Sequence, residues 1–285
     1  MNQFGEITYL NPAFERVLDF PSFDAIGANL ESFFDNEDHL YWCNMIEEII
    51  KNPIESIRNQ VKLRHRDGST RWCDVVFTNY LADPHINGIV FNIRDFTKQK
   101  EATDIVNQLA NFDFLTGLPN RRHFENYLRD SLKSAKKDNS RLALLFVDLD
   151  GFKHINDTLG HEIGDLLLKG VGERITSFFE ETAFVSRLGG DEFAVVIPNV
   201  NEYVYLQLLA ENLVKAFNLP FIVAEYKLNV SASIGISIYP IAGEDMGTLL
   251  KKADVAMYRA KHNGKNHYQL YIPSMEQNTV NTLIE

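Results

Sequence analysis

RLGGDEFAVV, residues 187 to 196, places two glycines and two carboxylates between two apolar runs. Because glycine readily adopts the positive φ of tight turns, the flanking runs FVSRL and FAVVIP are predicted to form a β-hairpin. Asp191 and Glu192 then lie at its tip, where two interpretations stay open. They are either solvated turn residues or ligands for a divalent metal, at a place where Gly189 and Gly190 let a ligand approach the backbone.

The chain around this hairpin alternates between strand and helix patterns from residue 113 to residue 272. LALLFVDLD (142–150) is an apolar run typical of a strand buried on both faces. EIGDLLLKGVGERITSFF (162–179) and MGTLLKKADVAMYRAKHNG (246–264) have apolar residues at helical spacing, whereas LNVSASIGISIY (228–239) alternates as a strand does. These patterns predict a central mixed sheet covered by helices.

Residues 1 to 97 have the character of a smaller domain with short elements. GEITYLN (5–11) alternates as a strand does, and PAFERVL after it has helical spacing. RHRDGSTRWCDVVFTNYL (64–81) predicts two strands joined at a DG dipeptide, and NGIVFNIRDFT (87–97) predicts a third. The chain is therefore expected to be an α+β protein of two domains, the first an antiparallel sheet with flanking helices.

A helix of different character, KQKEATDIVNQLANF (98–112), joins the two domains. Ala102, Ile105, Leu109 and Phe112 are spaced three, four and three residues apart, as in the seam of a two-stranded coiled coil. A linker helix packed on its own domain is the alternative.

Composition limits the classes of function. The 285 residues carry a net charge of −11, which argues against nucleic acid or an anionic membrane surface as the main partner. The longest aliphatic and aromatic run, LALLFV (142–147), is too short to span a bilayer, so no membrane insertion is expected. The only cysteines, Cys43 and Cys73, favour free thiols in a reducing, cytoplasmic compartment.

Polar residues that could bind a ligand or take part in a reaction cluster around the end of the 142–150 strand. Asp148 and Asp150 are two residues apart and are expected on one face of that strand; helix capping is the alternative for Asp148 alone. If the strand is adjacent to the hairpin, Asp148, Asp191 and the Leu149 carbonyl can hold Mg²⁺, which is usually bound by carboxylates together with substrate phosphates.

The following segment, FKHINDTLGHEIGD (152–165), offers groups for a nucleotide. Backbone N–H groups around Gly151 and Phe152, with the charge of Lys153, suit phosphate. Asn156 and Asp165 together can read the edge of guanine, because a carboxylate accepts from N1–H and the 2-amino group. As a set these residues predict a purine-triphosphate site.

Four motifs give the second domain a family resemblance. RLGGDEF, DLDGFKHINDTLGHEIGD, DFLTGLPNRRHF (113–124) and ADVAMYRAKHNGKN (253–266) resemble the GGDEF family of bacterial diguanylate cyclases, whose fold is that of the nucleotidyl cyclases. GEITYLNPAFERVL with RDGSTRW and IRDFT makes residues 1–97 resemble a PAS sensor, whose ligand the sequence does not indicate. Residues 98–112 are then a signalling helix, residues 113–272 the cyclase domain, and residues 273–285 a tail or the start of a connector helix to an EAL phosphodiesterase domain.

The GGDEF resemblance implies roles for individual residues. Asp148, the Leu149 carbonyl, Asp191 and Glu192 would hold Mg²⁺, with Mn²⁺ as an alternative, and Asp191 and Glu192 would also be catalytic. The implied GTP-binding residues are Gly151, Phe152, Lys153, Asn156, Asp165, Gly189, Gly190, Lys261 and Lys265. Lys265 departs from the family, which usually has arginine there. Arg121 and Arg122 match the family's NRR position, but a solvated surface role stays open for both.

The implied reaction is condensation of two GTP molecules into cyclic di-GMP with release of pyrophosphate. Because one such domain binds one GTP, a homodimer is expected. The alternatives are a non-catalytic GTP-binding domain that controls a neighbouring EAL phosphodiesterase domain, and a plain sensor scaffold. Many family members bind their product through an arginine and an aspartate upstream of the signature; the corresponding residues here are Glu180 and Ala183, which predicts that this inhibition is absent.

Overall fold

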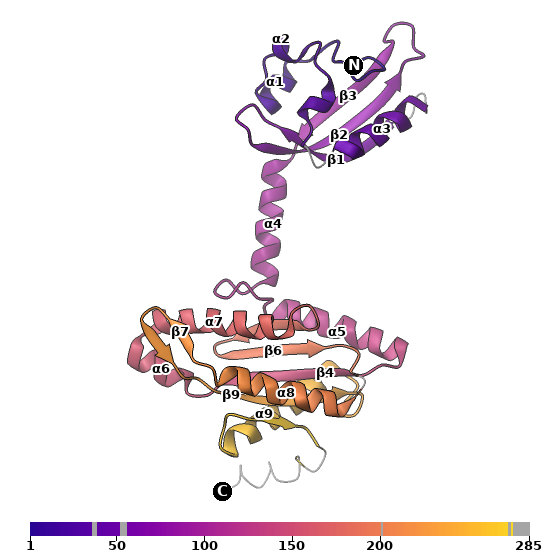
Figure 1. Ribbon diagram of the computed structural model, residues 1–285. Coiled ribbons are helices and arrows are strands. Elements are labelled where there is room, and N and C mark those ends of the chain that lie inside the picture. Colours follow the sequence, from indigo (N-terminus) through magenta and orange to yellow (C-terminus); the bar gives the residue numbers. More distant parts are fainter. Residues whose placement is uncertain (36–38, 52–55, 201, 273–274, 276–285) are drawn as a thin grey trace. The chain divides into compact units, whose positions relative to one another are not determined.

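The structure is a computed structural model that describes residues 1–35, 39–51, 56–200, 202–272 and 275. The chain divides into two compact units, Met1–Val106 and Asn107–Glu285 (Figure 1). Apart from Met275, the predicted tail or connector helix at 273–285 lies outside the described residues.

The first unit is a three-stranded antiparallel sheet in the order β1-β2-β3, accompanied by short helices. Its strands are β1 (Ser56–Arg64), β2 (Thr70–Tyr80) and β3 (Gly88–Asp95). Its helices are α1 (Ala13–Leu18), α2 (Ser22–Ala25), the 3-10 helix η1 (Leu30–Phe33) and α3 (His39–Lys51). The predicted hairpin is confirmed, with Gly68 at a φ of 88° in the turn. Phe33, Trp42, Leu63 and Phe77 belong to a continuous apolar core.

The expectation of a strand at GEITYLN (5–11) is wrong, because that segment forms only one isolated bridge, between Glu6 and Asn29. The N–H of Ile7 donates to the Ala28 carbonyl, and the Ile7 carbonyl accepts from Gly27. The backbone of this segment is thus paired with an irregular loop instead of a strand, so the alternating pattern reports burial of Ile7 and not sheet membership.

Helix α4 (Thr97–Asn111) begins in the first unit and ends in the second. The predicted helix is present, and Ile105 and Leu109 are 57% and 70% exposed on it. Phe112, directly after the helix, is also exposed. The apolar positions of the predicted seam are therefore open to solvent in the single chain.

The second unit contains a five-stranded mixed sheet in the order β10-β9-β4-β6-β5 (Figure 1). Only β9 and β10 run parallel; the other neighbours are antiparallel. Its strands are β4 (Leu142–Leu149), β5 (Phe184–Gly189), β6 (Glu192–Ile197), β9 (Ala232–Tyr239) and β10 (Tyr268–Leu270). The predicted mixed sheet is confirmed, and β4, between β9 and β6, is its central strand.

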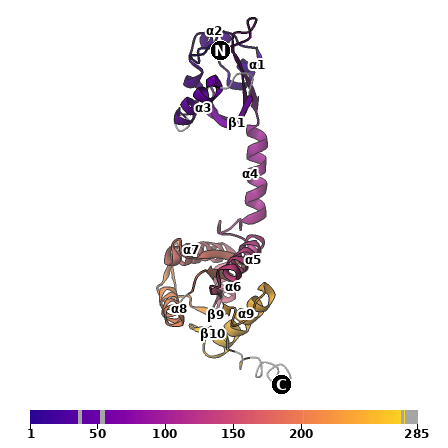
Figure 2. The same cartoon turned by 90° about the vertical axis from the view of Figure 1, so that its right-hand side faces the viewer.

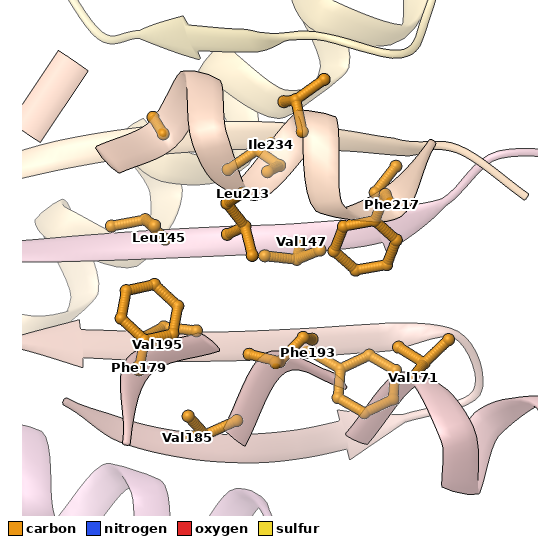
Figure 3. Packing of buried hydrophobic residues seen from close by; sticks show 14 of the residues in the cluster. Leu145, Val147, Val171, Phe179, Val185, Phe193, Val195, Leu213, Phe217 and Ile234 are labelled. Atoms are coloured by element: carbon orange, nitrogen blue, oxygen red, sulfur yellow. The ribbon is translucent and has the colours of Figure 1, made fainter. Parts of the chain in front are cut away.

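Helices cover both faces of this sheet (Figure 2). On one face α7 (His161–Phe179) and α8 (Tyr203–Phe217) pack on Leu145, Val147, Phe193 and Val195 (Figure 3). On the other, α5 (Arg121–Asp138) and α9 (Met246–His262) pack on alternate residues of the same strands. All eight residues of β4 are buried, as its continuous apolar run predicts.

The single strand predicted for 228–239 is divided in the structure. Its first residue, Leu228, is the last residue of β8 (Tyr226–Leu228), which pairs with β7 (Phe221–Val223) in a separate ribbon. Its remainder is β9, reached through a turn at which the Asp150 N–H donates to the Ser231 carbonyl at 2.9 Å. Alternation persists through the break because Leu228, Val230 and Ala232 contribute to one core.

Candidate active site

The turn between β5 and β6 has a backbone that glycine accommodates. Gly189 and Gly190 have φ values of 141° and 55°, in the region that residues with a Cβ rarely adopt. Strand register shifts between Arg187 and Gly189, which places a bulge directly before the turn. The turn thus presents Asp191 immediately before Glu192, the first residue of β6.

A buried ion pair fixes this turn. The Arg187 guanidinium donates to the Gly190 carbonyl from Nε at 3.0 Å and from Nη2 at 2.8 Å, while Nη1 lies 2.8 Å from Asp113 Oδ1. Burial acts to raise the pKa of Asp113, but hydrogen bonds from Arg187 and Thr116 outweigh it and hold that pKa below its ordinary value. The pair connects the turn to the segment that follows α4.

Asp148 is a buried carboxylate near the end of the central strand. Its register partners are Glu192 on β6 and Ser233 on β9, so it lies beside the turn that carries Asp191. Burial raises the pKa of Asp148 to about 6, opposed by the hydrogen bond from Lys261 and reinforced by the charges of Asp191 and Glu192. Lys261 Nζ lies 2.7 Å from Asp148 Oδ1.

Arg121, at the first position of α5, reaches the same turn. Its Nη2 is 3.6 Å from Glu192 Oε2, and its Nε donates to the Leu188 carbonyl at 3.4 Å. The side chain is 57% exposed, so the ion pair is loose and accessible to solvent. Of the two interpretations of Arg121, the structure favours a place at the turn; for Arg122 it records only an exposed residue.

The end of β4 leads directly into α6 (Phe152–Leu159) through Gly151, which has a φ of 78°. Within the described chain, no hydrogen bond is recorded for the N–H groups of Gly151, Phe152 and Lys153. Unpaired N–H groups at a helix start suit an anion. Lys153 is exposed beside them, so the predicted phosphate-binding residues do adjoin the end of the strand.

Asn156 and Asp165 lie on the neighbouring helices α6 and α7, which Gly160 joins. The Asn156 Oδ1 atom is buried and accepts no hydrogen bond within the described residues. A Cβ at Gly164 would lie 1.8 Å from it, so only glycine leaves room for this side chain. Asp165 is exposed. The helix pair therefore carries an acceptor without a partner next to an accessible carboxylate.

Asp150 and the loop that carries Lys265 also lie at the end of β4, joined by the hydrogen bond from the Asn266 N–H to Asp150. Asp150 lies past the last residue of β4 and contacts Ser231, Ser233 and Asn266, whereas Asp148 contacts Lys261. The two aspartates were expected on one face of the strand. Because β4 ends at Leu149, Asp150 lies outside the strand and has other partners than Asp148. Lys265 is exposed in the loop after α9, with a φ of 61°.

The structure also reveals connections that the sequence did not indicate. The pairing of Asp113 with Arg187 spans 74 residues. The contacts of Asp150 with Ser231, Ser233 and Asn266 span 81, 83 and 116 residues. Asp113 and Arg187 belong to the quoted motifs DFLTGLPN and RLGGDEF. A single sequence carries no signal that pairs one motif with the other.

Comparison with known families identifies both units. Residues 110–267 match the family described as diguanylate cyclase, GGDEF domain, and residues 1–98 match a PAS domain family. The chain therefore belongs to the GGDEF family and carries an N-terminal PAS domain, which confirms the resemblance of the motifs.

Individual relatives match about three fifths of the chain. A bifunctional diguanylate cyclase/cyclic di-GMP phosphodiesterase, MucR of Pseudomonas aeruginosa, is 44% identical over 60% of this chain and 25% of its own length. The diguanylate cyclase TpbB of the same species is 38% identical over 60% of this chain and 40% of its own. The chain thus spans a quarter to two fifths of these relatives.

Solved structures agree with the fold. A crystal structure of the GGDEF domain of TpbB is 37% identical, covers 55% of this chain and 98% of that chain, and has a TM-score of 0.54. Within the part of the chain that the structure describes, no helix is long and apolar enough to cross a membrane.

Proposed function

We propose that this chain is a diguanylate cyclase that condenses two GTP molecules into cyclic di-GMP. In each half-reaction the 3′-hydroxyl of one GTP attacks the α-phosphorus of the other. A new P–O bond forms, the bond between the α- and β-phosphates breaks, pyrophosphate leaves with the electron pair, and the hydroxyl proton passes to a base, for which Asp191 is our candidate. The observation that carries the proposal is the juxtaposition of Asp148, Glu192 and Asp191 with the N–H groups that start α6, which have no recorded hydrogen bond among the described residues.

The acidic residues fit a magnesium ion. Burial is the main cause of the raised pKa of Asp148, and the charges of Asp191 and Glu192 add to it; a divalent cation would relieve that repulsion. In the described ranges no three His, Cys, Asp or Glu side chains form a ready-made metal cluster. This is compatible with Mg²⁺, which is commonly held by one or two carboxylates, a carbonyl such as that of Leu149, and substrate phosphates.

Bound Mg²⁺ would lower the pKa of the attacking hydroxyl and neutralise phosphate charge. Lys261 forms an ion pair with Asp148, and we expect its ammonium to contact the phosphates when metal and GTP bind. Lys153 and Lys265 would supply further positive charge, and Gly189 and Gly190 would let substrate approach the turn.

Guanine would be held by Asn156 and Asp165. Asn156 is half-buried on α6 and would offer its amide to the base, and the exposed Asp165 carboxylate can accept from N1–H and the 2-amino group. Because each domain would bind one GTP, catalysis requires two chains that face each other. The exposed Ile105 and Leu109 on α4 are suited to pair such a dimer, and through α4 the PAS domain would set how the two domains meet.

A non-catalytic role in control of a phosphodiesterase is the second candidate, because relatives include the cyclic di-GMP phosphodiesterase PdeR of Escherichia coli, 35% identical over 64% of this chain. The intact acidic set favours catalysis. The deciding experiment is incubation of the purified chain with GTP and Mg²⁺, with pyrophosphate and cyclic di-GMP both quantified. Stoichiometric formation of both supports the cyclase; GTP binding without either product supports the regulatory role.

Base selection gives a first prediction. Asp165→Ser should relax discrimination against ATP. Adenine lacks N1–H and the 2-amino group, so it leaves the Asp165 carboxylate unpaired in the parent, and the variant removes that penalty. We expect the ratio of GTP to ATP affinity to fall by about tenfold or more. Competition binding measures it, with the exposed Glu162→Gln on the same helix as control. An unchanged ratio removes Asp165 from base recognition.

Product inhibition gives a second prediction. Glu180, exposed at the end of α7, would repel the phosphates of cyclic di-GMP, and the partly buried Ala183 offers no polar side-chain group. Loss of two charge-assisted contacts weakens binding by about a hundredfold or more. Initial rates should therefore persist when cyclic di-GMP is added at the low micromolar concentrations that inhibit a cyclase with an intact site. Strong inhibition that a Glu180→Gln variant abolishes would contradict the prediction.

The titration of Asp148 gives a third prediction. Its carboxyl has a folded-state pKa of about 6 against an ordinary value of 3.8, so the folded chain retains a proton that the unfolded chain loses between these values. The stability contributed by this proton is complete below the unfolded pKa and is lost as the pH rises through 6. Asp148→Asn does not titrate, and should stabilise the second unit by about 1–3 kcal/mol at pH 8, at about 1.4 kcal/mol per pKa unit.

The measurement is thermal unfolding of the metal-free parent and variant at pH 4 and pH 8. The variant's advantage should disappear at the lower pH, whereas Asp254→Asn, which removes an exposed carboxylate on α9, should show no such dependence. An advantage equal at both values would mean that Asp148 ionises with an ordinary pKa.

A further inference from the structure

Asp150, just past the end of β4, gathers three hydrogen-bond donors. Ser233 Oγ donates to its Oδ1 at 2.7 Å, and Ser231 Oγ donates to its Oδ2 at 2.7 Å. The backbone N–H of Asn266 also donates to Oδ2, at 3.1 Å. The serines belong to the start of β9 and the turn before it, whereas Asn266 follows α9. One side chain therefore holds two segments far apart in sequence against the end of the central strand.

The loop that Asp150 holds has an unusual backbone. Gly264, Lys265 and Asn266 have φ values of 109°, 61° and 52° in succession. Two consecutive non-glycine residues at positive φ are strained, and such a backbone persists only where surrounding contacts determine it. Lys265 N–H donates to the Ala260 carbonyl at 3.1 Å, and Asn266 N–H donates to Asp150. His267 Nδ1 also lies 2.9 Å from the Lys265 carbonyl oxygen. The carboxylate is thus one of the contacts within the described residues that stabilise this conformation.

The held loop carries one of the proposed phosphate-binding lysines and follows the other. Lys265 is the middle residue of the strained triplet, and Lys261 lies one turn earlier on α9, where it contacts Asp148. Immediately after the loop, the Ile234 N–H donates to the His267 carbonyl at 3.1 Å, so the loop is attached to β9 at that point too. Without the Asp150 contact, the segment between α9 and this attachment would lose its connection to β4.

We propose that Asp150 is a positioning residue for the triphosphate, which it does not touch itself. It fixes the 264–266 loop on the end of β4, so that Lys265 is held in place before GTP binds. The inference rests on the proposed GTP site but goes beyond it, because it assigns a function to a carboxylate outside the metal and substrate sets. Loss of the Asp150 carboxylate should lower the affinity for the phosphates and leave guanine recognition by α6 and α7 intact.

Binding measurements separate these effects without turnover. The probes are GMP and the analogue of GTP with a methylene group between the α- and β-phosphates, which cannot release pyrophosphate. Asp150→Ala should weaken binding of the analogue with Mg²⁺ by about tenfold or more, while GMP binding stays within about twofold. Asp254→Asn, an exposed carboxylate on α9, should change neither affinity.

Asp150→Asn distinguishes hydrogen bonding from charge. Its amide oxygen can accept from Ser231 and Asn266 while its NH₂ donates to the Ser233 hydroxyl, so analogue binding should recover to within about threefold of the parent. A metal ligand would not be rescued in this way, because an amide is a poor substitute for a carboxylate on Mg²⁺. Recovery supports positioning, and an affinity as low as that of Asp150→Ala overturns it.

Two further outcomes decide the inference. Unchanged analogue affinity in Asp150→Ala, or equal losses for GMP and the analogue, overturns it, the latter because the defect is then general. If Asp150→Ala does not fold, Ser231→Ala combined with Ser233→Ala keeps the carboxylate without two of its donors, and must weaken analogue but not GMP binding. Failure of the parent to bind the analogue would instead refute the proposed function.

Discussion

Asp191→Ala is expected to lower the rate of cyclic di-GMP formation on the order of a thousandfold or more, because it removes a proposed metal ligand and proton acceptor in one step. The side chain lies at a turn and is partly exposed, and no hydrogen bond to it is recorded within the described chain. The fold should therefore tolerate its loss, with a change in unfolding free energy of about 0.5 kcal/mol or less.

Product formation and thermal unfolding should be measured on the same preparations. Glu173→Ala, an exposed carboxylate on α7, is the matched control and should keep both activity and stability. Asp191→Asn refines the result, because it keeps the shape of the turn but neither the charge nor the basicity. Near-parental turnover in both Asp191 variants would exclude this residue from the mechanism.

Arg187→Met should destabilise the second unit by about 3–5 kcal/mol, because it leaves the Asp113 carboxylate, which is only 15% exposed, without its counter-ion. The arginine is only 8% exposed and its guanidinium makes three contacts, two of them with the Gly190 carbonyl. The same change frees the turn that carries Asp191, so activity should fall even at temperatures where the variant stays folded.

The chain offers a matched control for this pair. Lys133 and Asp130 also lie 2.8 Å apart, but both side chains are at least 70% exposed. Lys133→Met should change the unfolding free energy by about 0.5 kcal/mol or less, because solvent screens such a pair. Adding Asp113→Asn to Arg187→Met should recover part of the lost stability by removing the unpaired charge. Equal effects of Arg187→Met and Lys133→Met on the unfolding free energy would contradict the inference that the Arg187–Asp113 ion pair stabilises the second unit.

The central sheet was predictable because its strands carry strong local signals. The run before Asp148 is apolar throughout and is buried on both faces, and the glycine pair at 189–190 marks the hairpin turn. The expectation at 5–11 failed because an alternating pattern records which side chains are buried, whereas sheet membership depends on a backbone partner. There the partner is the loop around Ala28, which no local pattern distinguishes from a strand.

The candidate site was predictable in part, for a related reason. Asp148 and Glu192 are brought together by the pairing of β4 with β6, which the two strand patterns allow but do not specify. The ion pair of Lys261 with Asp148, and the contacts of Asp150 with Ser231, Ser233 and Asn266, depend on where α9 and β9 pack. Such contacts arise from tertiary packing, so they could not be derived from residue type and spacing.

The short connection between α4 and the turn that joins β5 to β6 has a consequence for exchanging sensor domains. The last helical residue, Asn111, accepts a hydrogen bond from the Asn120 N–H at 2.8 Å, and Asp113 begins the chain of contacts through Arg187 to Gly190. The end of the helix is thus connected to the turn by consecutive hydrogen bonds, with only Phe112 between Asn111 and Asp113. A foreign sensor joined upstream of Asn107, in helical phase with α4, should inherit that coupling unchanged. Even one residue inserted between Asn111 and Asp113 should leave both units folded, but the position of α4 should then no longer affect the turn at Gly190.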